Sequence, residues 1–341
     1  MRIITYAQAL VEAQQEEMER NENVFIMGED VGYSGGTFGA TFGLWEKFGP
    51  ERVRDTPISE AAIMGAGVGA ALAGMHPIID MQYLEFIPYM DALVNLAAKL
   101  HQMSGGQICV PVVLRGPLGA KGGNGAQHSQ YFESWFVNTP GLYVAMPSTP
   151  YDAKGLLKTA VRGQNPVVFI EDKTIYFTQG DVPEEEYTLP FGKADIKRAG
   201  KDVTVVATGI TVGLALKAAR ILSKEGIDVE VVDPRTLVPL DIETILQSLR
   251  KTHHVVVAHQ APKTGGFGAE IAAQIQELEF DELDAPVVRV AGLDVPAPYN
   301  VELEKKANVY EEDIIVGVHR VLEGIHMKDS MHEPVGLGSR S

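Results

Sequence analysis

The chain has 341 residues, 45% of them hydrophobic, and a formal net charge of −16 at pH 7. A chain of this length and apolar content forms one to three globular domains with sizeable cores. The negative charge argues against nucleic acid or an anionic membrane as the main partner, because neither attracts such a chain at long range. No apolar run is long enough to span a bilayer and residues 1–20 lack the apolar core of a signal peptide, so we predict a cytoplasmic protein.

Strand and helix patterns alternate through the first half of the chain, which predicts a parallel sheet with helical crossovers. The predicted strands are residues 24–27, 77–81, 110–115 and 167–171, and the predicted helices are residues 1–20, 65–74 and 90–103. A loop with two carboxylates, Glu29 and Asp30, follows the first strand. Cys109 is the only cysteine and lies among apolar residues, so we predict a buried small side chain and no intrachain disulfide.

The segment that ends at Glu60 places a carboxylate at the start of a helix of small residues. Pro57 forces the residue before it out of helical conformation, Ser59 is the predicted N-cap, and Glu60 falls in the first turn, where the helix dipole favours a negative charge. The glycines and alanines behind it allow another backbone to approach closely. This segment alone is compatible with a catalytic carboxylate or with an ordinary acidic first turn.

The glycines at 65, 67 and 69 also match a dinucleotide-binding fingerprint. That motif must directly follow a strand and needs a later acidic residue for the ribose, whereas Asp80 and Glu85 come too early. Glycines used for close helix packing explain the pattern better. The glycines at 265–268 lack the ending of a phosphate loop and are expected to start a helix.

A second α/β unit follows an acidic, turn-prone stretch at residues 181–200, which we interpret as a connection between domains. We predict a first domain at residues 1–180, a second domain at 201–325 and a flexible tail at 326–341. The second domain contains predicted strands at 203–208, 229–232, 254–258 and 287–290, and predicted helices at 212–224, 242–250 and 268–279.

Eight short motifs occur in an order that closely resembles the beta subunit of the thiamine-diphosphate-dependent first component of 2-oxo acid dehydrogenase complexes. They are GEDV at 28–31, DTPISE at 55–60, MSGG at 103–106, GAQHSQ at 125–130, PGL at 140–142, PS at 147–148, DPRT at 233–236 and GGFGAE at 265–270. The resemblance covers about residues 3–323. The segments at 152–157, 171–174 and 192–197 look more like the acetoin dehydrogenase branch than the pyruvate or branched-chain branches.

The resemblance implies a transketolase-like fold with a pyrimidine-binding α/β domain and a C-terminal α/β domain. It also implies a divided cofactor site: this chain binds the aminopyrimidine ring of thiamine diphosphate, and an alpha subunit holds the diphosphate and magnesium. The sequence contains no Gly-Asp-Gly triplet, with which the metal-binding motif of the partner begins. We therefore expect this chain to hold no metal by itself.

Two catalytic residues follow from the resemblance. Glu60 matches the glutamate that hydrogen-bonds the pyrimidine nitrogen and promotes loss of the thiazolium proton, a role that requires a carboxyl group shielded from water. His128, in a glycine-rich loop, matches the histidine that faces the substrate and stabilises charge or transfers protons there. A solvated loop histidine is the alternative interpretation for His128.

Further candidates match the family less closely. Gln82 and Phe86 lie where the family places a glutamine and an aromatic ring that stacks on the pyrimidine, although Tyr83 is a competing ring and core packing is an alternative. Ile58 would touch the pyrimidine through its backbone carbonyl. Glu29 lies in the motif that supplies a carboxylate between the two active sites, or it is a loop acid that holds backbone amides.

The implied enzyme is an alpha2-beta2 heterotetramer that cleaves a 2-oxo acid or acetoin next to the carbonyl and passes the acyl group to the lipoyl arm of an acyltransferase. A branched-chain 2-oxo acid dehydrogenase beta subunit, and a transketolase-family half-protein with another class of substrate, remain alternatives. A single-chain transketolase would need the diphosphate-binding half in the same chain. A pure scaffold would need neither Glu60 nor His128.

Overall fold

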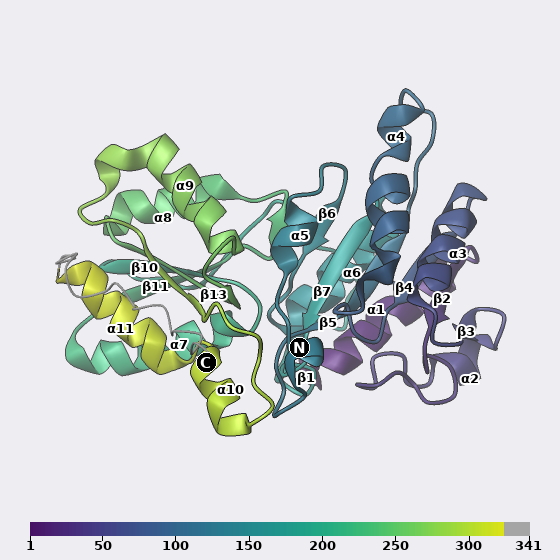
Figure 1. Cartoon of the computed structure of the whole chain (residues 1–341), viewed down its shortest axis with the longest axis horizontal. Coiled ribbons are helices and arrows are strands. Elements are labelled where there is room, and N and C mark those ends of the chain that lie inside the picture. The colour runs from purple at the N-terminus through teal and green to yellow at the C-terminus, as the bar shows by residue number, and fades with distance from the viewer. Residues whose placement is uncertain (324–341) are drawn as a thin grey trace, which may run out of the picture.

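The computed structural model describes residues 1–323, which form two α/β units side by side (Figure 1). The first unit is built on a seven-stranded sheet in the order β12-β6-β7-β5-β4-β2-β3. Its parallel strands are β2 (Val24–Gly28), β3 (Val53–Asp55), β4 (His76–Asp80), β5 (Val113–Leu118), β6 (Tyr143–Ala145) and β7 (Val167–Asp172). Its helices include α1 (Tyr6–Arg20), α2 (Leu44–Phe48), α3 (Glu60–Leu72), α4 (Leu100–Met103), α5 (Glu133–Val137) and α6 (Pro150–Arg162).

The second unit contains a five-stranded sheet in the order β14-β13-β10-β11-β9, in which only β9 runs antiparallel to its neighbour. Its strands are β9 (Asp195–Arg198), β10 (Val203–Ala207), β11 (Val229–Asp233), β13 (Val255–Pro262) and β14 (Val288–Gly292). Its helices include α7 (Ile210–Leu222), α8 (Ile242–Thr252), α9 (Phe267–Glu279), α10 (Val301–Ala307) and α11 (Glu311–Leu322). The predicted α/β architecture with mostly parallel sheets is confirmed.

Several predicted elements have different bounds in the structure. Residues 2–5 are not helical, because β1 (Arg2–Thr5) pairs with β8 (Gln179–Val182) and Thr5 then caps α1. The helix predicted at 90–103 is a wide π-helical turn over Ala92–Ala97 followed by the short α4. The stretch predicted as a connection, 181–200, contains β9 and the end of β8. The tail predicted at 326–341 lies outside the described residues.

The prediction that Cys109 is buried is wrong. Cys109 is exposed and lies in the extended segment between α4 and β5. The buried part of this segment begins only at Val110, and β5 itself begins at Val113 rather than at 110. The apolar neighbours of Cys109 therefore indicated the coming strand, not the environment of the thiol.

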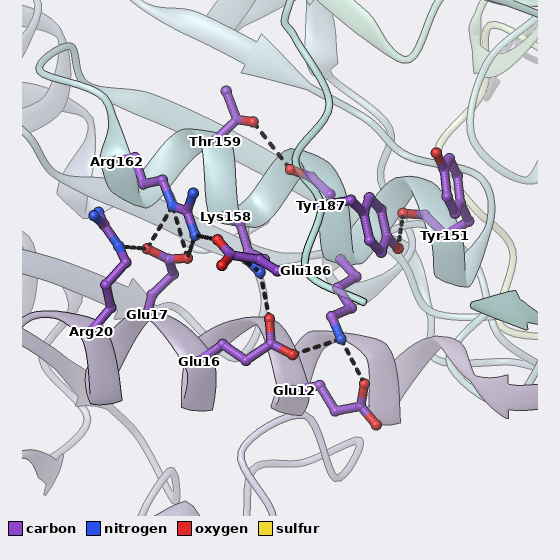
Figure 2. Close-up of polar contacts among 12 residues, drawn as sticks. Glu12, Glu16, Glu17, Arg20, Tyr151, Lys158, Thr159, Arg162, Glu186 and Tyr187 are labelled. Atoms are coloured by element: carbon purple, nitrogen blue, oxygen red, sulfur yellow. Dashed lines mark hydrogen bonds and ion pairs between the residues drawn. The ribbon is translucent and has the colours of Figure 1, made fainter. Parts of the chain in front are cut away.

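The acidic side of α1 packs on the basic side of α6. Figure 2 shows Glu16 and Lys158 pointing toward each other, and Glu17 lying against Arg162 at 2.6 Å. Lys154 is also fully buried and lies 2.7 Å from Glu16. The acids of the first helix therefore stabilise a helix pair that covers the sheet.

A strand and an ion-pair cluster are among the contacts that join the second unit to the first. Strand β12 (Thr236–Val238) comes from the second half of the chain and pairs antiparallel with β6 of the first sheet. Beside it, Asp152 of α6 is fully buried and binds Lys197 and Arg235, with 2.7 Å from Arg235 Nε to Asp152 Oδ1. Burial also raises the pKa of Asp233, in the same cluster, to about 6. The DPRT motif is thus part of the junction between the units.

No helix among the described residues has both the length and the apolar composition needed to cross a membrane.

A buried arginine connects three neighbouring strands of the first sheet. Arg115 of β5 donates two hydrogen bonds to Glu171 of β7, at 2.7 and 2.6 Å, and a third to Asp80 of β4. Burial acts to lower the pKa of Arg115. The charges of Asp80 and Glu171 act in the opposite direction, and the net result is a raised pKa. Tyr176 donates a further hydrogen bond to Glu171. These contacts make Arg115 the main charged link within the sheet.

Arg115→Met is expected to destabilise the chain by about 3–5 kcal/mol, because it leaves the carboxylates of Asp80 and Glu171 buried without a partner. Urea unfolding measures this loss. Arg250→Met is the matched control, because Arg250 pairs with Glu243 and Glu279 at the surface and exposed ion pairs add little. Equal stability of the two variants would show that the buried network does not hold the sheet.

Candidate active site

The candidate residues gather where parallel strands of the first sheet end. Glu29 follows β2, and Ile58 and Glu60 follow β3. Gln82 and Phe86 come after β4, and His128 is carried by the loop after β5. Because these strands are parallel neighbours, their carboxyl ends lie on one edge of the sheet, which is where open α/β sheets bind ligands. We call this edge, with the loops that follow these strands, the site edge.

Glu60 is the first residue of α3 and is half-buried at the site edge. The helix starts where the sequence indicated, with Ser59 at its N-cap as predicted, but the Ser59 side chain makes no capping hydrogen bond. Ile58 is 80% exposed, and the hydroxyl of Thr56 is buried without a hydrogen-bond partner among the described residues. The segment that leads to Glu60 therefore keeps polar groups that the described chain does not satisfy.

The glycines of α3 divide into two kinds. A Cβ on Gly67 would lie 2.7 Å from Ile79, so this glycine allows α3 to pack on β4. A Cβ on Gly65 or Gly69 would meet nothing within 4 Å. All three lie inside the helix and none lies in a strand-to-helix turn, which agrees with rejecting the dinucleotide fingerprint. Packing within the described chain explains Gly67 only.

Glu29 is buried close to other acids of the site edge. Burial raises its pKa, and the charges of Glu60, Asp30 and Asp80 raise it further. The interaction shows that Glu29 and Glu60, 31 positions apart in the sequence, reach each other electrostatically. The structure therefore brings together the two carboxylates that the motifs had singled out.

Glu29→Gln is expected to raise the free energy of unfolding at pH 7, because burial and three like charges oppose the ionised form of the wild-type carboxylate. The folded chain takes up this proton at a higher pH than the unfolded chain does. Wild-type stability therefore falls as pH rises from the unfolded pKa through the folded pKa, and it stays lower above that interval.

Urea unfolding should show the gain of Glu29→Gln at pH 7 and its disappearance toward pH 4. The exposed Glu22→Gln is the control, and its stability should not follow this pattern. A loss of stability for Glu29→Gln at pH 7 would show instead that the Glu29 carboxylate makes favourable contacts.

An aromatic wall, formed by Tyr83 and Phe86, lies against His128. The ring centroid of His128 is 5.5 Å from that of Tyr83 and 5.0 Å from that of Phe86, both with edge-to-face geometry. Tyr83 and Phe86 are 5.9 Å apart and both are half-buried. His128 is therefore not a solvated loop residue, and the two rings that competed in the sequence lie together beside it.

The backbone is strained where the loops after β2 and β4 meet. Asp30 and Gln82 both have left-handed conformations, with φ of 54° and 52°. The amide of Gln82 donates to Thr37 at 2.7 Å and to Asp30 at 3.4 Å, while its backbone N–H donates to Asp80 at 2.9 Å. Gln82 thus links the two loops across the site edge.

Sequence reasoning missed two ion pairs that support these loops. Arg115 binds Asp80, which in turn holds the backbone of Gln82. Lys173, directly after β7, is fully buried and pairs with Glu85 from the loop of the aromatic wall. A charged residue at the end of a buried strand was the available signal, but the sequence does not show which partner lies across the sheet.

The site edge fits one part of thiamine diphosphate and not the other. A carboxylate at Glu60 and the rings of the aromatic wall suit a flat heterocycle with nitrogen donors and acceptors. The charges of Glu60, Asp30 and Asp80 raise the pKa of Glu29 there, while the buried cations Arg115 and Lys173 are already paired with acids. This charge balance does not suit a diphosphate. The residues present therefore fit the pyrimidine ring alone.

A cavity of about 590 Å³ lies between the loop of His128 and the second unit. Gln127, Trp135 and Gln260 are among its lining residues, whereas Glu60 is not. The carboxylate of Glu60 therefore lies at an open edge, not in this cavity.

Comparison with known proteins agrees with this geometry. The family model of the transketolase pyrimidine-binding domain matches residues 2–178, and that of the transketolase C-terminal domain matches residues 192–314. A solved structure titled "Split gene transketolase, inactive beta4 tetramer" has a TM-score of 0.72 and 26% identity, and the match covers 94% of this chain and 98% of that chain. The fold and the site edge together define a transketolase-type α/β protein with a pyrimidine-binding domain.

Relatives define the family more closely. The chain is 46% identical to 2-oxoisovalerate dehydrogenase subunit beta of Bacillus subtilis (strain 168), over 95% of this chain and 100% of that protein. It is also 46% identical to pyruvate dehydrogenase E1 component subunit beta of Rickettsia felis, over 93% of this chain and 98% of that protein. The chain belongs to the family of beta subunits of the first component of 2-oxo acid dehydrogenases, and the resemblance drawn from its motifs is confirmed.

Proposed function

We propose that the chain supplies the pyrimidine-binding half of a thiamine-diphosphate-dependent active site that cleaves a carbon–carbon bond next to a carbonyl and transfers the acyl group to a lipoyl arm. The observation that carries the proposal is the site edge itself. It places His128 beside an aromatic wall and Glu60 close enough to Glu29 for their charges to interact, and its two fully buried cations, Arg115 and Lys173, are already paired with acids. The proposal includes a cytoplasmic location, which rests on the sequence pattern alone.

The residues of this chain divide the work at the site. Thiamine diphosphate, when bound, supplies a thiazolium ring that stabilises negative charge on the reacting carbon. Glu60 would hold a proton at the pyrimidine nitrogen, and Ile58, Gln82 and a ring of the aromatic wall would orient that ring. His128 would stabilise oxygen charge or move a proton on the substrate side. Glu29 would take part in proton transfer with Glu60, because the charge of Glu60 already acts on the Glu29 carboxylate.

The missing half would come from an alpha subunit that holds the diphosphate and magnesium, in an alpha2-beta2 assembly. The open face of α3 supports this arrangement, because Gly65 and Gly69 leave room for another backbone directly behind Glu60. The related split-gene transketolase chain is described as an inactive beta4 tetramer, which fits a beta chain without activity of its own. A lipoyl acyltransferase would be the further partner.

The substrate is a 2-oxo acid or acetoin. The motifs at 152–157, 171–174 and 192–197 favour acetoin, whereas the names of the relatives are those of pyruvate and 2-oxoisovalerate dehydrogenase subunits. We propose acetoin as the first substrate to test, with pyruvate and the branched-chain 2-oxo acids as the alternatives.

Assembly with an alpha subunit tests the proposed function. We expect the purified chain to show no micromolar binding of thiamine diphosphate and magnesium by calorimetric titration, because its site edge lacks a diphosphate cradle. Co-expression with an alpha subunit should restore binding and give turnover of one of these substrates with an artificial electron acceptor. Micromolar binding by the chain alone would contradict the divided site.

Glu60→Gln is expected to slow proton exchange at the thiazolium carbon of the assembled enzyme by about 10²–10⁴-fold, the range of general acid–base catalysis. The amide keeps the shape of the side chain but cannot carry the proton. Exchange into deuterated solvent, followed by NMR, measures the effect. Glu51→Gln is the control, because Glu51 is exposed and pairs only with Arg54. A normal rate of thiazolium proton exchange in Glu60→Gln would show that another carboxylate activates the cofactor, and Glu29 would be the first to test.

A further inference from the structure

Lys173 is a buried cation that the proposed chemistry does not use. It follows directly after β7, and its backbone N–H donates to Leu118 of β5 at 3.2 Å, which extends the pairing of the two strands. Its side chain is fully buried beneath the site edge. Burial lowers the pKa of Lys173, and the charge of Glu85 opposes that shift. A buried lysine needs a carboxylate partner, and Glu85 satisfies that need.

The ammonium group makes two further contacts, and both are with the candidate site. It donates a hydrogen bond to the backbone carbonyl of His128, with 2.7 Å from Nζ to the oxygen. It also lies 4.5 Å from the ring centroid of Tyr83, over the face of that ring. An ammonium group has three hydrogens to donate. Here Glu85, Tyr83 and His128 surround it.

These contacts join two loops that come from different strands. Tyr83 and Glu85 follow β4, whereas His128 follows β5. The loop of His128 is rich in glycine, and Gly122, Gly123 and Gly125 all have positive φ. A hydrogen bond of 2.6 Å from the Gly123 N–H to Glu304 of the second unit holds its first part. Lys173 holds its last part, at His128 itself.

We propose that Lys173 is the positioning residue of His128: it fixes the backbone of this histidine and, through Tyr83, the wall against which the imidazole lies. The proposal rests on the proposed function in one respect, that His128 acts on the substrate. Its structural part, the placement of the imidazole by Lys173, stands apart from any substrate. The two parts are therefore measured separately.

The test replaces both charges of the pair, so that no unpaired ion is left buried. The variant is Lys173→Met with Glu85→Gln. Its matched control is Lys158→Met with Glu16→Gln, which removes another pair with a fully buried lysine, between α1 and α6 (Figure 2). The histidine ring carbons of the full chain are labelled for NMR, and His128→Gln identifies the His128 resonance.

In the wild type, we expect ring currents of the aromatic wall to displace the His128 resonance from the position of an exposed histidine. Lys173→Met/Glu85→Gln should move it toward that position, while the control leaves it unchanged. In the enzyme assembled with its alpha subunit, kcat of acyl transfer to lipoamide should fall about 10²-fold with KM close to wild type, as for a misplaced reactive group.

An undisplaced His128 resonance in the wild type overturns the proposal, and this measurement does not depend on the folding of Lys173→Met/Glu85→Gln. A variant that matches the control in both resonance and kcat also overturns it and leaves Lys173 a structural ion pair. If the assembled wild type transfers no acyl group, the proposed function fails, and the NMR comparison still decides whether Lys173 places His128. If the resonance moves and kcat does not, Lys173 places an imidazole that the reaction does not need, which contradicts the catalytic part.

Discussion

The buried guanidinium of Arg115 is the interaction on which the site edge depends. It donates hydrogen bonds to one carboxylate on each neighbouring strand, Asp80 of β4 and Glu171 of β7. Charge therefore links three parallel strands, from the middle of β5 to the last residue of β4 and to Glu171 near the end of β7. The second oxygen of Asp80 binds the backbone N–H of Gln82. The left-handed conformation of Gln82 is thus held by a buried ion pair.

The same arrangement explains why the site edge is acidic. Both of its buried cations are neutralised by acids of the same chain: Arg115 binds Asp80 and Glu171, and Lys173 binds Glu85. Glu29 and Glu60 have no such partner among residues 1–323, and the charge of Glu60 raises the pKa of Glu29. A polyanionic ligand would meet repulsion at this edge, whereas a neutral heterocycle that exchanges a proton would not. This use of the buried cations supports the proposal that the cofactor is divided between two chains.

The sequence was sufficient for the parallel sheet, and the segments with Glu29 and Gln82 follow predicted strands, whereas β3, which precedes Glu60, was not predicted. Parallel strands bring such motifs to one edge without any knowledge of their contacts. It was not sufficient for Cys109, whose neighbours are buried only from Val110 onward. The pair of Lys173 and Glu85 spans 88 positions, and no local pattern shows that the ends of β4 and β7 share one buried charge.

Helix α3 shows how one element serves both the chain and its assembly. A glycine inside a helix costs about 1 kcal/mol relative to alanine. Gly67 offsets this cost by allowing α3 to pack on Ile79, but Gly65 and Gly69 have no such contact within the described residues. A contact outside the chain would offset it, and these glycines follow Glu60 by one and a half to two and a half helical turns. A backbone that packs there would also exclude water from Glu60. The carboxylate would then gain the shielding that its proton transfer needs from the same contact that completes the site.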